Sequence, residues 1–336
     1  MNDFLLLPDL AARALGGAVI AANDDFFADR AHLLLPYPVS EHPEFGLRGK
    51  VYDGWETRRR RSPGSDHAVI RLGVPGIVHG VVVDTAYFTG NHPPEMSVQG
   101  VQLDGHPAPA DLDAVGWSEI LPRSVALGDT RNTYPVADGG RWTHLRLTIH
   151  PDGGVARLRV HGIPRPDPAL LAGTIDLAAT ENGGRVMAAT NEFYSAPAQL
   201  LLPGPARHMG EGWETARRRD EGNDWVVVAL AGLGVPREVE VDTSCFLGNA
   251  PGWARVLGSA AAPSVTDPVT VGRNWWRTRR CSPTPGTASC SRVHRRSATC
   301  GWTSTPMAAS RGCGCAANLG EFLLPFLSGV VVSLRT

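Results

Sequence analysis

The chain has 336 residues, of which 43% are hydrophobic and 19% charged, and its formal net charge is −1. This length suits two domains with separate cores, and a charge near zero gives no global field that would attract nucleic acid or an anionic membrane. Because no apolar run is long enough to span a bilayer and the first residues lack a secretory signal, we expect a cytoplasmic protein without a nucleic-acid or membrane partner.

The chain is a tandem duplication. Residues 16–27 return as residues 183–194, residues 53–61 as residues 211–219, and residues 81–91 as residues 239–249. Trp55 and Trp213 are 158 positions apart, and so are Asp84 and Asp242. This fixed spacing predicts two copies of one module. We place the first module at residues 1–170 and the start of the second at residues 171–258.

The apolar segments of both modules are short and rich in β-branched residues. Gly and Pro separate them, and no long segment keeps a helical period. We therefore predict an all-β protein of two tandem jelly-roll β-sandwich modules. The expected strands are residues 68–72, 77–83 and 145–149 of the first module, and residues 225–230 and 239–241 of the second.

A turn signal lies near the end of the first module. Residues 151–154 read Pro-Asp-Gly-Gly and separate the apolar segments 145–149 and 155–160. These are the residue types that a tight hairpin turn requires. We therefore expect the two flanking segments to be adjacent strands.

An acidic loop opens each module. Asn23, Asp24 and Asp25 form it in the first module, and Asn191 and Glu192 repeat it in the second. Carboxylate and amide oxygens can hold a divalent ion or accept hydrogen bonds from urea-like groups. The alternative is that the loop caps a short helical turn. A divalent metal ion is thus a candidate cofactor, with no ligand set assigned.

The next repeated block reads Gly-Trp-Glu-Thr followed by arginines. A guanidinium group binds a carboxylate with two hydrogen bonds, and a Glu can transfer a proton. The block therefore suits a small anionic substrate that is rich in amide groups. The alternative is that Trp55 and Trp213 anchor the cores while the arginines form a solvated edge or pair with acids of their own module. The charged candidates are Glu56, Arg58, Arg59 and Arg60 in the first module and Glu214, Arg217 and Arg218 in the second.

A third block follows a strongly apolar run. Asp84 and Thr85 stand where a strand is expected to end, and Asn91 lies in the turn that follows. Binding residues often lie at such strand ends. The alternative is an Asx-type turn that satisfies only the backbone, an interpretation that fits Asn91 better than Asp84. Among the scattered histidines, His67 beside Asp66 is the one that merits a test.

The last part of the chain breaks the repeat. Residues 300–315 stand where a counterpart of residues 145–160 should be, yet they show no hydrophobic period, and no acidic residue lies between Asp267 and Glu321. GC-rich codons read one base earlier can restore the missing Pro-Asp-Gly-Gly segment. We interpret residues 259–336 as a poorly structured tail produced by a frame shift between Gly258 and Arg277. Its five cysteines are then out-of-frame codons rather than metal or disulfide ligands.

The blocks at residues 22–27, 50–60 and 83–91 resemble those of the allantoicase (allantoate amidinohydrolase) family of purine catabolism. The resemblance runs from about Leu15 to Gly258 and includes the duplication. It implies two galactose-binding-like jelly-roll modules and a hydrolase that acts on linear amidine C–N bonds. The implied reaction converts allantoate, a small-molecule substrate, to ureidoglycolate and urea, in a homo-oligomer.

Allantoate has one carboxylate and two ureido groups, so its hydrolysis calls for an arginine clamp, acceptors for N–H groups and a proton-transfer residue. The candidate bases are Glu56 and Asp84. Two alternatives stay open: a non-catalytic β-sandwich that binds a sugar or small polar ligand, and an inactive frame-shifted relative. The candidate substrate-binding residues are Asn23, Asp24, Arg58, Arg59, Arg60, Thr85, Asn91, Glu214, Arg217, Arg218, Asp242 and Asn249.

Overall fold

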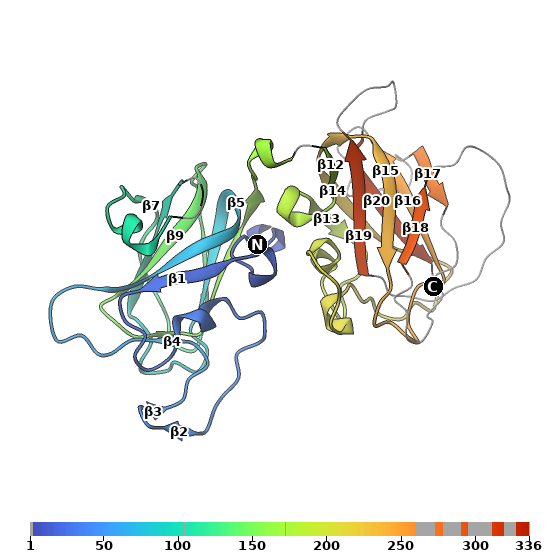
Figure 1. Ribbon diagram of the computed structural model, residues 1–336. Coiled ribbons are helices and arrows are strands. Elements are labelled where there is room, and N and C mark those ends of the chain that lie inside the picture. Colours follow the sequence, from blue (N-terminus) through green and yellow to red (C-terminus); the bar gives the residue numbers. More distant parts are fainter. Residues whose placement is uncertain are drawn as a thin grey trace. The chain divides into compact units, whose positions relative to one another are not determined.

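The chain divides into two compact units, Met1–Arg165 and Pro166–Thr336 (Figure 1). The computed structural model describes residues 3–103, 105, 107–171 and 173–259, and the backbone of four later strands at residues 273–277, 290–294, 311–318 and 327–335. No helix in this described part is long and apolar enough to cross a membrane. Its helices are short 3-10 turns of three to five residues.

The first unit is built on one long strand, β5 (Asp66–Asp84). The first half of β5 pairs with β1 and β9, and the second half pairs with β8 and β11. The other strands are β1 (Ala18–Ala22), β2 (Phe45–Gly46), β3 (Gly49–Lys50), β4 (Trp55–Glu56), β6 (Glu95–Val101), β7 (Ser118–Val125), β8 (Arg131–Pro135), β9 (Arg141–His150), β10 (Gly154–Val155) and β11 (Arg157–Pro164), and the 3-10 helices are η1 (Asp3–Leu6), η2 (Arg13–Leu15), η3 (Arg30–Leu34) and η4 (Pro109–Asp113).

The second unit contains a five-stranded sheet in the order β13-β14-β20-β16-β17 and a four-stranded sheet in the order β12-β19-β15-β18. Its strands are β12 (Thr174–Asp176), β13 (Arg185–Ala189), β14 (Asp224–Gly234), β15 (Pro236–Asp242), β16 (Trp253–Ser259), β17 (Arg273–Arg277), β18 (Cys290–His294), β19 (Arg311–Asn318) and β20 (Leu327–Arg335), and its 3-10 helices are η5 (Pro168–Leu170), η6 (Thr180–Asn182), η7 (Pro197–Leu201) and η8 (Met209–Glu211).

The duplication is visible in the backbone. In each unit the first strand of the repeat pairs antiparallel with the long central strand, and the pairing shifts at the same place: between Val19 and Ala21 in β1, and between Val186 and Ala188 in β13. The prediction of an all-β protein with two tandem modules is confirmed.

The repeated tryptophans anchor the two cores. Trp55 and Trp213 are both fully buried, and each belongs to the main hydrophobic cluster of its unit. The indole N–H of Trp55 donates to the carbonyl of Asp24 at 2.7 Å, and that of Trp213 donates to the carbonyl of Asn191 at the same distance. Each tryptophan therefore fixes the acidic opening loop onto the core.

Replacing Trp55 by alanine should destabilise the first unit. Truncation of a fully buried Trp leaves a cavity and removes a hydrogen bond, which together cost about 3–5 kcal/mol. Chemical denaturation followed by tryptophan fluorescence and circular dichroism measures this change. Leu47→Ala, at a fully exposed position, serves as the control and should change the free energy of unfolding by less than about 0.5 kcal/mol. An equal effect of the two substitutions would contradict the placement of Trp55 in the core.

The predicted hairpin at residues 151–154 is wrong. Its flanking strands, β9 and β11, pair with opposite ends of β5 and not with each other. The segment between them has other partners: β10 pairs with β4, and the Asp152 carboxylate accepts the backbone N–H of Arg60 at 2.8 Å. The Pro-Asp-Gly-Gly segment therefore connects two strands that do not pair with each other. The reason is that the backbone of β10 bonds to the Gly-Trp-Glu-Thr block instead of closing a hairpin.

The segment interpreted as a frame-shifted tail contains strands β17 to β20. The residues between and after these strands, including Cys281 and Cys300, lie outside the described residues. The frame shift stays a prediction. Among the described residues of the second unit, Cys245 is a free cysteine.

Candidate active site

Two repeated motifs meet in the first unit. Glu56 ends β4, which is held in place by its pairing with β10. Asn91 lies in the turn after β5, and its carbonyl accepts the backbone N–H of Gly154 in β10 at 2.7 Å. The Asn91 side-chain amide donates to Glu56 Oε1 at 2.7 Å. The strand pair β4–β10 therefore brings a carboxylate and an amide together from positions 35 residues apart.

An open pocket of about 420 Å³ lies beside this pair. Its volume is within the range of small-molecule sites. Two cationic side chains, Arg48 and Lys50, come from the short hairpin β2–β3 and face the same pocket as Glu56. The pocket is lined by Phe27, Arg48, Gly49, Lys50, Tyr52, Glu56, Thr89, Gly90 and Asn91.

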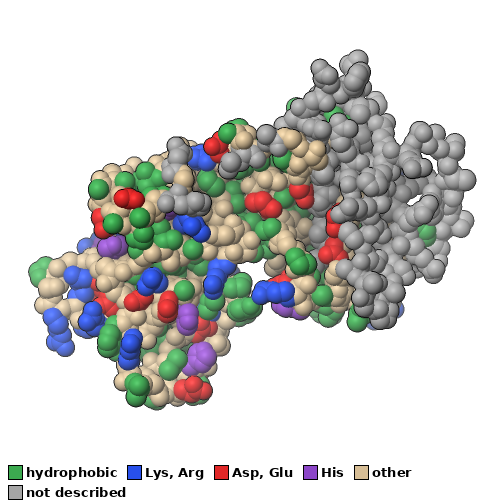
Figure 2. All heavy atoms as spheres, in the orientation of Figure 1, with side chains coloured by type: hydrophobic (Ala, Val, Ile, Leu, Met, Phe, Trp, Pro, Cys, Tyr) green, Lys and Arg blue, Asp and Glu red, His purple; other side chains and the backbone are tan. Residues whose placement is uncertain are grey.

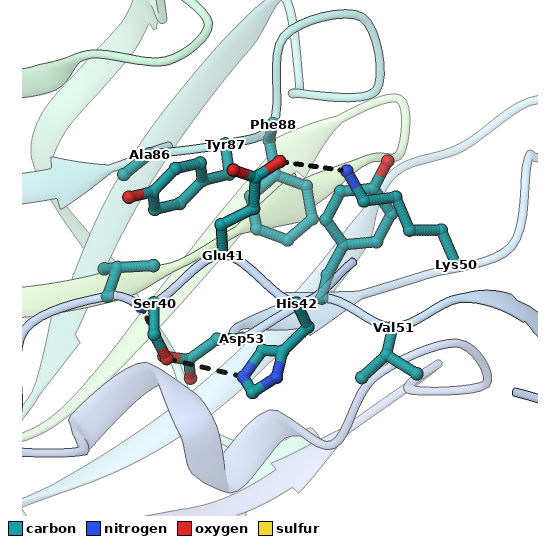
Figure 3. Close-up of a pocket in the computed structure, with 11 residues that line it drawn as sticks. Ser40, Glu41, His42, Lys50, Val51, Asp53, Ala86, Tyr87 and Phe88 are labelled. Carbon is teal, nitrogen blue, oxygen red and sulfur yellow. Dashed lines mark hydrogen bonds and ion pairs between the residues drawn. The ribbon is translucent and has the colours of Figure 1, made fainter. Parts of the chain in front are cut away.

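The two cations are supported by aromatic rings. Arg48 donates to the carbonyl of Phe26 at 2.6 Å, and its guanidinium lies 4.7 Å from the centre of the Phe26 ring. The Lys50 ammonium lies 5.3 Å from the centre of the Tyr52 ring and 3.7 Å from the Glu41 carboxylate. Figure 3 shows Lys50 and Glu41 turned toward one another across a small neighbouring hollow that Tyr52 also lines. These contacts orient both positive charges beside the pocket.

Glu56 is the carboxylate of this pocket. Burial raises its pKa above the ordinary value of 4.5, and the hydrogen bond from Asn91 acts in the opposite direction. Since Asn91 uses only Oε1, the second oxygen of Glu56 is available to a water molecule or a substrate N–H. A carboxyl group whose pKa is raised toward neutral is better suited to proton transfer.

The second unit repeats the Glu–Asn pair, next to a loop that has no counterpart of Arg48 and Lys50. Asn249 donates to Glu214 Oε1 at 2.7 Å, as Asn91 does to Glu56. The segment before the tryptophan is shorter in this unit: Asp53 follows Pro36 by 17 positions, whereas its counterpart Glu211 follows Pro203 by 8. The second copy therefore has no counterpart of the hairpin that carries Arg48 and Lys50.

Asp84 and Thr85 are held in backbone contacts away from this pocket. The Asp84 carboxylate accepts the N–H of Ala86 at 2.9 Å, and the Thr85 hydroxyl donates to the carbonyls of Leu127 and Thr130. Asp242 likewise accepts the N–H of Ser244 at 2.8 Å. The structure reverses the expected assignment of the Asx turn, which falls on the aspartates rather than on Asn91.

The acidic opening loop is tied to side chains of its own unit. Asn23 donates to Asp66 at 2.9 Å and accepts the backbone N–H of His67 at 2.7 Å. Asp24 accepts from Arg58 at 2.6 Å, and Asp25 pairs with Arg30. Because the side-chain oxygens of Asn23, Asp24 and Asp25 each bind a different partner, they do not converge on one metal ion. In the described part of the chain, no group of three or more His, Cys, Asp or Glu side chains is placed to hold a metal ion.

The arginine blocks show the same behaviour. Arg60 pairs with the buried Asp66 at 2.5 Å, and Arg218 pairs with the buried Asp224 at 2.9 Å. Arg59 and Arg217 are exposed and do not line the pocket. Among the predicted binding residues of the first unit, only Glu56 and Asn91 face the pocket.

Sequence reasoning missed most of the pocket wall. Arg48, Thr89 and Gly90 were not singled out as binding residues, and neither was Lys50, although it is the only lysine of the chain. One signal was available, since the first copy is longer than the second between Pro36 and Asp53. Figure 2 shows Lys and Arg side chains alternating with acidic ones over the first unit, so composition alone does not mark this hairpin.

Comparison with known proteins assigns the family. The allantoicase repeat model matches residues 8–165 and 175–285. The chain is 59% identical over 265 residues to a probable allantoicase of Nocardia farcinica, covering 76% of this chain and 79% of that one. It is 49% identical over 268 residues to a probable allantoicase of Streptomyces coelicolor, covering 75% of this chain and 71% of that one.

Solved structures agree with this result. The crystal structure of allantoicase from Saccharomyces cerevisiae matches with a TM-score of 0.72 at 26% identity, covering 98% of this chain and 93% of that one. A second allantoicase structure matches with a TM-score of 0.74 at 26% identity, covering 97% of this chain and 88% of that one. Both the repeated sequence blocks and the tandem β-modules are thus shared, and the chain belongs to the allantoicase family.

Proposed function

We propose that this protein hydrolyses allantoate to ureidoglycolate and urea at the Glu56 pocket of the first unit. One observation carries the assignment: the Glu56–Asn91 pair faces the same pocket as Arg48 and Lys50. Allantoate has complementary groups, namely one carboxylate and two ureido groups. Positive side chains bind a carboxylate, and a carboxylate–amide pair supplies acceptors and donors to a ureido group.

In the proposed complex, Arg48 and Lys50 hold the substrate carboxylate. Phe26 and Tyr52 keep these cations in place, so less conformational freedom is lost on binding. A ureido group lies against Asn91 and Glu56. The central carbon of allantoate, which carries both ureido groups and the carboxylate, is then positioned close to the Glu56 carboxylate.

Glu56 moves the protons of the reaction. Its ionised carboxylate accepts a proton from water as the water oxygen bonds to the central carbon. The bond from this carbon to one ureido nitrogen breaks, and the proton passes to that nitrogen so that neutral urea leaves. Ureidoglycolate retains the new hydroxyl group and the second ureido group, and Glu56 returns to its ionised form.

Steady-state measurement of urea and ureidoglycolate formed from allantoate, by the chain with its reading frame restored after Gly258, tests this proposal. Equal amounts of the two products are expected. Release of urea without ureidoglycolate, or of neither product, would contradict it. A non-catalytic binding protein would bind allantoate and return it unchanged.

Arg48→Ala should raise KM for allantoate roughly tenfold and change kcat by less than about threefold. The reason is that a charge-assisted hydrogen bond to the substrate carboxylate contributes to ground-state and transition-state binding alike. Initial rates over a range of allantoate concentrations separate the two constants. Arg13→Ala, at an exposed arginine outside the pocket, is the matched control and should leave both constants unchanged. A fall in kcat with KM unchanged would contradict the role given to Arg48.

We also propose that the segment after Gly258 is read in a shifted frame, so that residues 259–336 no longer carry the sequence of the repeat's closing strands. The chain in which this frame is restored is called the frame-restored chain below. The curated relatives support the idea, since the matches to Nocardia farcinica and Streptomyces coelicolor cover 76% and 75% of this chain. We further propose that the active protein is a homo-oligomer and acts in the cytoplasm.

A further inference from the structure

The loop that carries Arg48 and Lys50 is closed at its base by one buried side chain. Arg157, the first residue of β11, is 3% exposed. Its Nε donates to the carbonyl of Tyr37 at 3.3 Å, and its Nη1 donates to the carbonyl of Asp53 at 3.0 Å. Tyr37 and Asp53 are the two ends of the loop, so the same guanidinium holds both.

An ion pair reinforces this closure. Arg157 Nη2 donates to Asp53 Oδ2 at 2.6 Å, and the same oxygen accepts the backbone N–H of Ser40 at 3.0 Å. Although burial opposes it, the hydrogen bonds from Arg157 and Ser40 hold the pKa of Asp53 below its usual value. Asp53 therefore stays ionised at neutral pH and keeps Arg157 paired. Figure 3 shows Ser40 and Asp53 together at this end of the loop.

We call Arg157 and Asp53, with the hydrogen bonds between them and to Tyr37, the clamp. Paired strands connect the clamp to the rest of the site. Arg157 pairs in register with Asp84 at the end of β5. It lies two residues after Val155, which pairs with Trp55 in β4, and Glu56 is the next residue of β4. The base of the loop and the Glu56 carboxylate are thus connected through four strands, β4, β10, β11 and β5.

The described part of the second unit shows a different arrangement. Glu211, the counterpart of Asp53, pairs with Arg207 inside its own short and exposed loop. The i,i+4 pair closes a loop that carries no counterpart of Arg48 or Lys50. The clamp and the cationic hairpin therefore occur together in the first unit.

We propose that Arg157 and Asp53 are positioning residues that hold the loop of residues 37–53 over the pocket and thereby set its preference for a ligand with a carboxylate. The inference rests on the proposed function of that pocket. Neither residue lines the 420 Å³ pocket. They act through Arg48 and Lys50, which a loosened loop would no longer place beside Glu56.

Binding measurements on the full chain test the clamp without requiring turnover. The probes are N-carbamoylglycine, which has one ureido group and one carboxylate, and its neutral amide. Arg157→Gln should weaken the affinity for N-carbamoylglycine about tenfold and change the affinity for the amide less than about twofold, because only the carboxylate uses the displaced cations. Isothermal titration calorimetry gives both constants.

Two further variants guard against a general loss of structure. Asp53→Asn removes the ion pair while keeping a hydrogen-bond acceptor, and it should show the same selective loss to a smaller degree. Arg159→Gln is the matched control: Arg159 is also on β11 and binds the carbonyls of Leu33 and Leu35, before the loop begins. It should lower the melting temperature and leave the ratio of the two affinities unchanged.

The outcomes separate the clamp from the proposed function. If the unmodified chain binds neither probe, the pocket is not a ureido-carboxylate site and both ideas fail. If it binds N-carbamoylglycine and Arg157→Gln weakens both probes equally, or neither, the clamp is rejected and the pocket assignment stands. If Arg157→Gln selectively weakens N-carbamoylglycine binding in the unmodified chain, but not in a chain where Arg48 and Lys50 are both alanine, Arg157 acts through the loop.

Discussion

Glu56→Gln is expected to reduce urea release from allantoate roughly a thousandfold in the frame-restored chain. Glutamine keeps the shape of the side chain and can still contact Asn91, but it cannot accept a proton, and a positioned proton-transfer group contributes about 10²–10⁴-fold to rate. The pocket should still bind substrate, so KM should change little. Initial rates of urea formation measure the loss.

The substitution should not damage the fold. Burial raises the pKa of Glu56, so the folded state binds the proton more tightly than the unfolded state does. The ionised form therefore costs stability as the pH rises from 4.5 through the raised pKa. At neutral pH, Glu56→Gln should keep or raise the melting temperature. The same raised pKa predicts a pH dependence of activity. As the pH is lowered, kcat/KM of the unsubstituted protein should fall with a midpoint above pH 4.5, because protonated Glu56 cannot accept a proton.

Glu214→Gln is the matched comparison, because Glu214 makes the same contact with Asn249 in the second unit. It should change the rate less than threefold. If Glu214→Gln were the inactive variant and Glu56→Gln the active one, the reaction would belong to the second unit. If both abolished urea release, the two Glu–Asn pairs would be required together.

Restoring the reading frame after Gly258 is expected to increase urea release relative to the chain as given, because a more stable second unit raises the share of the protein that is folded. The restored sequence supplies the second unit with its own Pro-Asp-Gly-Gly segment. In the first unit this segment supports β4 and the residues after it, through β10 and Asp152. Without it, the segment around Trp213 and Glu214 loses the corresponding support. Purified proteins of both sequences, assayed side by side with allantoate, give the comparison.

Unfolding measurements distinguish the reasons for that increase. In the restored chain, the midpoint denaturant concentration of the second unit's unfolding transition should be higher. The midpoint of the first unit's transition should be unchanged. Equal activity and equal stability of the two proteins would contradict the frame shift, as would one clean frame that encodes residues 259–336 when the gene is sequenced again.

The sequence predicted the fold class because the repeat and the strand pattern are local signals. Its main error in strand length concerns β5, where Gly73 and Gly76 suggested a break between two strands. In the structure β5 continues through both, with a shift in its pairing with β9 between Arg71 and Gly76. A side chain at Gly73 would meet Leu15, and one at Gly76 would meet the carbonyl of Ile163. These glycines permit close approach of neighbouring segments, which no local pattern reveals.

The sequence predicted only those residues of the candidate site that have a counterpart in the second copy. Glu56 and Asn91 stood out because Glu214 and Asn249 echo them, whereas Arg48 and Lys50 lie in a segment without a counterpart. The arginines after Trp55 were conspicuous in the sequence, yet Arg60 is committed to the buried Asp66. Which cations face a pocket depends on pairing across 40 residues or more, as between Arg157 and Asp53, and sequence spacing does not contain this information.

The most direct test of the account is the product balance of the frame-restored chain and its Glu56→Gln variant with allantoate. The account predicts that the unsubstituted protein forms urea and ureidoglycolate in equal amounts and that the variant, equally folded, forms almost none. Equal rates for the two proteins would show that Glu56 is not the proton-transfer residue, and the absence of both products from the unsubstituted protein would contradict allantoate as its substrate.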